Sequence, residues 1–316
     1  MRNNVRRFVQ ARRTWQALTG ISIVVAVIIP VLTLPGLPRF SVWPALIGLL
    51  PWTVGKYVLC PLRWHALSES GRSRRWHMAT FAEAELIGML TPGHLGADVW
   101  RMRRLCQGGM PRLSAVTEVA LDRFIGAVGV TLFCACAASA LPLRAVLTTL
   151  AVATVGLLAV LVVRRLRPQW VPQRDLPSPR NVTQGLLLSI GYQASIIALL
   201  IGTILSTGYQ VSLLDVIAAF GASQLVGAIP GPQGASPKDG ALVLALVHLG
   251  VPWGAALGAV TLKALLAWGP ALLFGVGCLL VTRRRIGDGE TPAGVVTAHP
   301  MGAVTGVVVA GQVAVA

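Results

Sequence analysis

TPGHLGA at residues 91–97 and PGPQGA at residues 230–235 each interrupt an apolar stretch of the chain. Proline and glycine break a helix at such a turn. The arms around the breaks are Met78–Leu90 with Ala97–Cys106, and Leu213–Ile229 with Lys238–Leu249. Each arm is shorter than the roughly 20 apolar residues that a helix needs to cross a bilayer. Because irregular backbone at membrane depth must be buried in protein or line a wet cavity, we expect two re-entrant hairpins.

The composition around these breaks is typical of a membrane protein. Of the 316 residues, 54% are hydrophobic and 12% charged, and the mean hydropathy is +0.70. Soluble domains carry about 25% charged residues. The predicted spans are Ala17–Leu34, Val42–Leu62, Ser114–Leu141, Leu143–Val163, Val182–Ser206 and Trp253–Val281. The sequence therefore predicts an all-α polytopic membrane protein with about six transmembrane helices, in a domain over residues 17–283. A basic N-terminus (residues 1–16) precedes it, and a tail (residues 284–316) that we expect to be disordered follows it.

The basic residues lie at the ends of the predicted spans. The formal net charge is +16, and arginines cluster in residues 2–13, 63–75, 164–167 and 283–285. Six crossings place all four clusters on one side, so the positive-inside rule predicts that both termini are cytoplasmic. We expect a multi-pass protein of the bacterial cytoplasmic membrane. No aromatic-rich basic face accompanies the arginines, so nucleic acid is not an expected partner.

The two hairpins resemble one another in sequence. After a three-residue insertion, a register of 141 residues pairs Asp98 with Asp239 and the tripeptide at 109–111 with that at 250–252. Three spans separate the copies, so the second (about 143–283) would be inverted relative to the first (about 17–141). Inverted repeats with broken helices near the bilayer midplane are a transporter design.

Charged residues lie within or beside the apolar segments. They are Glu83, Glu85, Asp98, Glu118, Asp122, Asp215 and Asp239, with Lys56, Arg123, Lys238 and Lys263. A charge at mid-bilayer is costly and is by default paired and facing a cavity. Two interpretations stay open: internal ion pairs that hold the hairpins, or a polar path for a ligand. The first is favoured for Glu83 and Glu85, and the second for Arg123 and Lys263.

The helix starts after the two breaks expose N–H groups that suit a phosphate or carboxylate, although such turns serve equally as connectors. The candidate substrate-binding residues are Gly93, Gly96, Asp98, Arg101, Asp122, Arg123, Gly234, Lys238, Asp239 and Lys263. His94 is the type of loop histidine that is more often a bystander than a proton relay. The tryptophans Trp43, Trp52, Trp64, Trp76 and Trp170 are expected in the interfacial belts of the membrane.

No nucleophile elbow, Walker loop, metal-ligand spacing or dinucleotide fingerprint is present, and none of the five cysteines forms a CxxC pair. We therefore expect no enzymatic activity, no metal and no cofactor.

The segments LTPGHLGADVWR (90–101) and AVTEVALDRFIG (115–126) resemble the lysylphosphatidylglycerol synthase transmembrane-region family. A second motif is similar over residues 229–234 and at Gly250-Val251, and the likeness covers roughly residues 15–283. The resemblance implies a lipid flippase module that, in fuller members, is fused to a soluble synthase domain. That domain is missing here, so lipid synthesis is not implied. Lys238-Asp239 and Lys263 depart from the arginine-containing patterns common in the family. Because these are candidate substrate-binding positions, the resemblance does not identify the substrate.

The leading hypothesis is a flippase for a membrane lipid, whether an anionic or aminoacylated phospholipid or a polyprenyl-linked lipid. The alternative is a non-transporting membrane partner that scaffolds a cell-envelope glycosyltransferase or lipid synthase. A membrane-embedded enzyme acting on lipid is a weaker third interpretation. Association with further copies of the chain or with an envelope-synthesis enzyme stays open.

Overall fold

The computed structural model describes residues 40–89, 91, 94–135, 177–226 and 236–287, with isolated residues between 24 and 32 and between 147 and 166. The predicted spans at 17–34 and 143–163 therefore fall almost wholly outside the described residues. The same holds for Pro92-Gly93, for residues 227–235 and for the tail from residue 288. All the regular secondary structure within the described ranges is helical.

The first long helix contains a π-helical turn. It is made of α2 (Trp43–Val54), η1 (Gly55–Leu59) and α3 (Cys60–Leu67). Pro61 cannot donate a backbone hydrogen bond, and its ring crowds the carbonyl four residues before it. The helix widens ahead of Pro61, so that the N–H of Cys60 bonds to the carbonyl of Gly55. Such π-turns often mark functional positions in helices, and this one carries Lys56.

Helix α8 (Pro179–Ser206) packs antiparallel along this first helix. Its C-terminal half lies against α2, where a Cβ added at Gly48 would stand 2.6 Å from the carbonyl oxygen of Ala198. Its N-terminal half lies against α3, where a Cβ at Gly185 would meet Leu67. Small residues allow two backbones to approach in this way inside a membrane.

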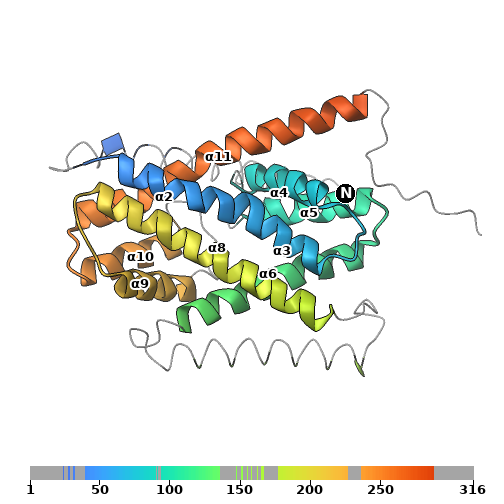
Figure 1. Cartoon of the computed structure of the whole chain (residues 1–316), viewed down its shortest axis with the longest axis horizontal. Helices are drawn as coiled ribbons and strands as arrows, with labels where there is room; N and C mark the ends of the chain where they lie inside the picture. The colour runs from blue at the N-terminus through green and yellow to red at the C-terminus, as the bar shows by residue number, and fades with distance from the viewer. Residues whose placement is uncertain are drawn as a thin grey trace, which may run out of the picture.

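Two helical hairpins flank the α2–α3 and α8 pair, toward opposite ends of the molecule (Figure 1). The first consists of α4 (Arg74–Met89) and α5 (Leu95–Gln107), and the second of α9 (Leu213–Leu225) and α10 (Pro237–His248). Helix α6 (Arg112–Ala135) follows the first hairpin and α11 (Trp253–Gly287) the second. The first arm of each hairpin contacts the closing helix of the other half, α4 on α11 and α9 on α6.

The two halves share the same backbone turn between hairpin and closing helix. Gly109 and Gly250 have φ angles of 94° and 88°. The next residue in each half donates its N–H to the carbonyl of Leu105 or Leu246, at 3.2 and 3.1 Å. A residue with a Cβ is strained at such a φ, which accounts for glycine at both positions. The register of 141 residues noted in the sequence is thus repeated in the backbone.

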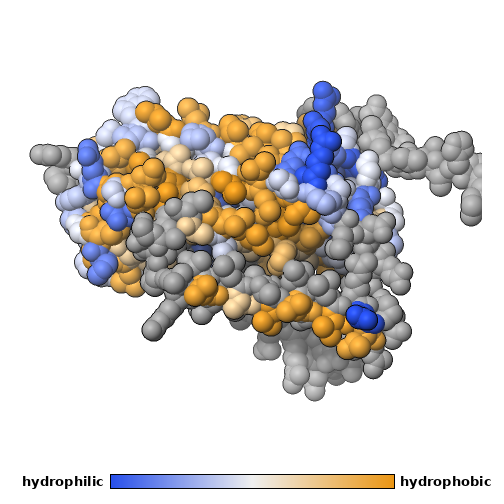
Figure 2. Space-filling view, turned by 60° about the horizontal axis from the view of Figure 1, so that its bottom comes forward, coloured by the Kyte–Doolittle hydropathy of each residue, from blue (hydrophilic) through white to orange (hydrophobic). Residues whose placement is uncertain are grey.

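The described helices are those of a membrane protein. Within the described ranges, three are long and apolar enough to cross a bilayer: Trp43–Leu67, Pro179–Ser206 and Trp253–Thr282. They correspond to the predicted second, fifth and sixth spans. Figure 2 shows a broad hydrophobic surface with hydrophilic residues gathered toward its two ends. Helix α6 takes the place of the third predicted span and carries buried charges. Helix α11 continues past the predicted end at residue 281, through the terminal arginines to Gly287.

Candidate functional site

The break in the first hairpin positions a cluster of polar side chains. His94, directly before α5, has φ 59° and ψ 17° and is the one non-glycine residue with positive φ among the described residues. A left-handed residue of this kind costs about 1–3 kcal/mol and persists only where its surroundings hold it. The hydroxyl of Thr91 accepts the N–H of Gly96 at 2.9 Å, which satisfies one donor of the first turn of α5. Gly93, a candidate residue, lies outside the described residues.

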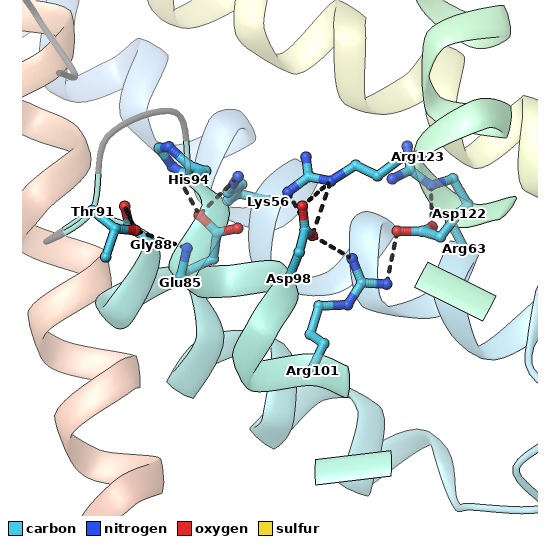
Figure 3. Close-up of polar contacts among 11 residues, drawn as sticks. Lys56, Arg63, Glu85, Gly88, Thr91, His94, Asp98, Arg101, Asp122 and Arg123 are labelled. Atoms are coloured by element: carbon cyan, nitrogen blue, oxygen red, sulfur yellow. Dashed lines mark hydrogen bonds and ion pairs between the residues drawn. The ribbon is translucent and has the colours of Figure 1, made fainter. Parts of the chain in front are cut away.

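Lys56, Glu85 and His94 come together at this break (Figure 3). Lys56 Nζ lies 2.9 Å and His94 Nε2 3.6 Å from the same oxygen, Glu85 Oε2. The side chain of Glu85 is 5% exposed, that of Lys56 15% and that of His94 28%. Lys56 also lies over the rings of Phe81 and Tyr192, each 5.7 Å from its ammonium group.

A second group of charges joins α5 to α6. The guanidinium of Arg123 donates to Asp98 at 2.9, 3.0 and 3.2 Å. Arg101 Nη1 lies 3.8 Å from Asp98 Oδ1, which also accepts two of the bonds from Arg123 (Figure 3). Asp98 is 22% exposed and Arg123 50%, whereas Arg101 is only 2% exposed. The structure thus brings the candidate residues Asp98, Arg101 and Arg123 together.

Asp122 is a buried anchor for two arginines. Its oxygens accept from Arg63 Nε and Arg101 Nη2, each at 2.8 Å, and the side chain has no exposed surface. Arg101 additionally lies 4.2 Å from the centroid of the Trp64 ring. Buried charges are tolerated when they are paired and hydrogen-bonded in this way. The candidate residue Asp122 thus ties α3, α5 and α6 together.

The interfacial-belt prediction was wrong for Trp64, which is fully buried. Its indole N–H donates to Glu118 at 2.9 Å, and Glu118 also accepts from the hydroxyl of Ser68 at 2.7 Å. Glu118 lies one turn before Asp122 on the buried face of α6, so the hydrogen-bond partner of the Trp64 indole is inside the protein. His77 packs edge-on against Trp64, and burial there lowers the pKa of His77.

The second hairpin brings three further candidate residues together. Asp239 forms a capping box with Ser236 at the start of α10 and lies 3.4 Å from Lys263 of α11. This pair joins α10 to α11 as the Asp98–Arg123 pair joins α5 to α6, although Lys263 is equivalent to Asp122 in the 141-residue register. Lys238 lies over the ring of Phe220 at 5.8 Å. Lys238 is also close enough to Lys263 for their like charges to repel each other, while Asp239 attracts Lys238.

Lys238 is also near enough to Lys56 for their like charges to interact weakly, so we count both hairpins as one combined site. Gly234 lies outside the described residues. The cations of the combined site are Lys56, Arg63, Arg101, Arg123, Lys238 and Lys263, and its carboxylates are Glu85, Asp98, Asp122 and Asp239. With His94 neutral, six cations against four carboxylates leave a surplus of two positive charges. The chain has 27 lysines and arginines in all, yet its three lysines are all in this site.

Sequence reasoning missed several contributors to the site. Arg63 was placed in a cytoplasmic cluster, and no local pattern connects it to a carboxylate 59 residues away. Lys56 was recognised as a charge within a span, and Glu85 was assigned to an ion pair, without a partner for either. Among the described residues, no three histidine, cysteine or acidic side chains are grouped to hold a metal.

Glu83 forms a separate cluster on a different face of α4, two residues before Glu85. It is fully buried, accepts from the indole of Trp100 at 3.0 Å and from Thr282 of α11 at 2.7 Å, and lies 3.3 Å from Arg104. This is the internal ion pair that the sequence favoured for Glu83. It joins the first hairpin to the closing helix of the second half.

Comparison with known proteins agrees with the motifs of the first hairpin. No curated protein matches the chain. The family model described as "Lysylphosphatidylglycerol synthase TM region" matches residues 7–275, which include both hairpins, the whole of α6, the first two thirds of α11 and every candidate residue. The chain therefore belongs to the lysylphosphatidylglycerol synthase transmembrane-region family.

Proposed function

We propose that this protein moves a lipid across the cytoplasmic membrane and binds the lipid headgroup between the two hairpins. The observation that carries the proposal is the surplus of positive charge in the combined site, inside an apolar helical protein. A positive surplus at membrane depth favours a ligand with an anionic group, and the phosphate of a phospholipid or polyprenyl-linked lipid meets that requirement.

The repeated architecture supports transport. The long helices α2–α3 and α8 each precede the hairpin of their half and run antiparallel to each other. Antiparallel counterparts are what a pair of inverted repeats requires. We propose that α4–α5 and α9–α10 are re-entrant hairpins entered from opposite sides of the membrane, with both termini cytoplasmic. Alternating access would then come from one half rocking against the other.

The charged residues divide into two roles under this proposal. Asp122, Arg63 and Arg101 are almost completely buried and hold the helices in place. Arg123 and Asp98 keep exposed surface and are placed to contact the headgroup. Lys238 and Lys263 offer the matching cations at the second hairpin. No catalytic step is assigned to any of them, because translocation needs binding and release only.

The test is lipid movement in proteoliposomes with Arg123→Ala. We expect transport to be lost while the protein still folds, because an exposed carboxylate left by Arg123 can be hydrated. The matched control is Arg112→Ala, which removes an exposed arginine from the start of the same helix. Arg112→Ala should transport like the parent.

The scaffolding alternative makes the opposite prediction. A scaffold would leave lipid movement in the parent no faster than in protein-free vesicles, and Arg123→Ala would change nothing. Either result would refute the proposed transport.

A further inference from the structure

His94 is held in an unusual conformation at the position where the first hairpin breaks. Its φ of 59° is unfavourable for a residue with a Cβ, and its side chain does not cap α5. Gly88 of α4 makes room for the ring, since a Cβ at Gly88 would stand 3.2 Å from His94 Cδ2. The strained backbone therefore brings the imidazole toward Glu85.

The ammonium group of Lys56 and the imidazole of His94 both face one oxygen of Glu85. Lys56 is at hydrogen-bonding distance, 2.9 Å, whereas His94 Nε2 is at 3.6 Å from the same Oε2. A charge-assisted N–H···O bond has a length of about 2.7–2.9 Å. A movement of less than one ångström would complete that bond once Nε2 carries a proton, and Lys56 would then share its carboxylate.

We propose that His94 binds the proton that couples lipid movement to the proton gradient. A proton taken from water by His94 Nε2 draws Glu85 away from Lys56, and the released ammonium group of Lys56 binds the anionic group of the lipid. Loss of the proton restores the Glu85–Lys56 pair and releases the lipid. This inference rests on the proposed function and adds the coupling ion to it.

The groups facing His94 from the packed elements allow this exchange. Glu85 faces it from α4 and Lys56 from η1. Asp98 lies one turn further along α5 and is held by Arg123 of α6. Tyr192 of α8 lies beside Lys56, and Lys238 of α10 acts on Lys56 as a like charge. Among these groups, His94 is the one whose residue type ordinarily titrates between about pH 5 and 8. Its 28% exposed side chain gives water access to it.

The sequence assigns this proton site to one half of the protein. The position of His94 in the first break is occupied by Pro232 in the second, which cannot bind a proton. The second half has Lys238 and Lys263 near Asp239, and its segment between α9 and α10 contains no histidine.

The first experiment measures lipid movement in proteoliposomes of the parent and of His94→Asn. Asparagine tolerates the left-handed backbone but does not titrate. The control is His248→Asn, which changes an exposed histidine at the end of α10. The parent and His248→Asn should show a rate that changes between about pH 5 and 8, and His94→Asn should show a flat profile. A gradient of one pH unit should support a lipid asymmetry of up to about tenfold in the parent and none in His94→Asn.

A second measurement does not depend on transport. Reductive methylation with ¹³C labels the three lysines of the chain and preserves their charge, so their NMR signals can be separated. The Lys56 signal should shift across the same pH range in the parent and in His248→Asn, and this shift should be absent in His94→Asn and in Glu85→Gln.

The outcomes separate the two proposals. A pH profile in His94→Asn equal to that of the parent overturns the proton site, as does a Lys56 signal that titrates in the same way in both proteins. A parent that moves no lipid at any pH refutes the proposed function and proton-coupled transport with it. The lysine spectra still show in that case whether His94 controls the Glu85–Lys56 pair.

Discussion

Asp122→Asn tests the division between anchoring and exposed charges. Asparagine has the size of aspartate but lacks its charge, so the change leaves the helices in place and removes the common partner of Arg63 and Arg101. These two side chains are 8% and 2% exposed, and water reaches neither readily. Arg63 would keep one weak bond to Ser189 at 3.3 Å, and Arg101 would keep Asp98 at 3.8 Å.

The expected cost follows from this geometry. Removing one partner of a buried ion pair destabilises a protein by about 3–5 kcal/mol, because the other charge stays buried without compensation. Asp122 serves two arginines, so the upper end of that range is expected. Asp98→Asn is the matched comparison, since it makes the same chemical change beside a half-exposed arginine. An exposed pair contributes about 0–1 kcal/mol, so Asp98→Asn should melt close to the parent.

The assay is thermal unfolding in detergent, followed with a dye that becomes fluorescent on reaction with thiols. Cys60 and Cys134 are buried at 3% and 7% exposure, so they react only when the helices separate. Adding Arg101→Gln to Asp122→Asn should recover part of the lost stability, because it removes one stranded cation. The reasoning is refuted if Asp122→Asn melts at the temperature of the parent, or if Asp98→Asn loses as much stability.

Two further predictions concern packing and topology. Gly48→Leu should separate α2 from α8 and lower the yield of folded protein, because its Cβ would stand 2.6 Å from a carbonyl oxygen of α8. Gly254→Leu is the control, since its side chain enters open space and should be tolerated. Size-exclusion chromatography of the two variants tests this, and equally monodisperse profiles would contradict it. In a cysteine-free background, a cysteine at position 70 should resist a membrane-impermeant thiol reagent added outside the cell, and a cysteine at position 209 should react. The reverse labelling pattern would exclude the proposed orientation.

Several candidate residues of the site could be identified from the sequence because charged side chains are unusual within apolar stretches. A charge in an apolar stretch needs a partner, so Asp98, Arg123, Lys238 and Lys263 could be singled out from the sequence. The 141-residue register then predicted equivalent positions in the two halves, and the paired glycines at 109 and 250 bear it out in the backbone. These signals are local in sequence, or are repeated in it at a constant interval.

The partners of those charges could not be predicted in the same way. Arg63 and Asp122 lie 59 residues apart, and they meet only because α3 and α6 cross at that point. Lys56 faces Glu85 because a π-turn rotates the first helix ahead of Pro61, and His94 reaches the same carboxylate through a left-handed backbone.

The sequence by itself determined the membrane class, the helical segments and the places where helices break, because hydropathy and backbone sterics act within a few residues. The tertiary structure decided which charges pair, which stay partly exposed and which oxygen two cations share. Those outcomes depend on how helices cross and how closely their backbones approach, and both are set by packing between segments distant in the chain.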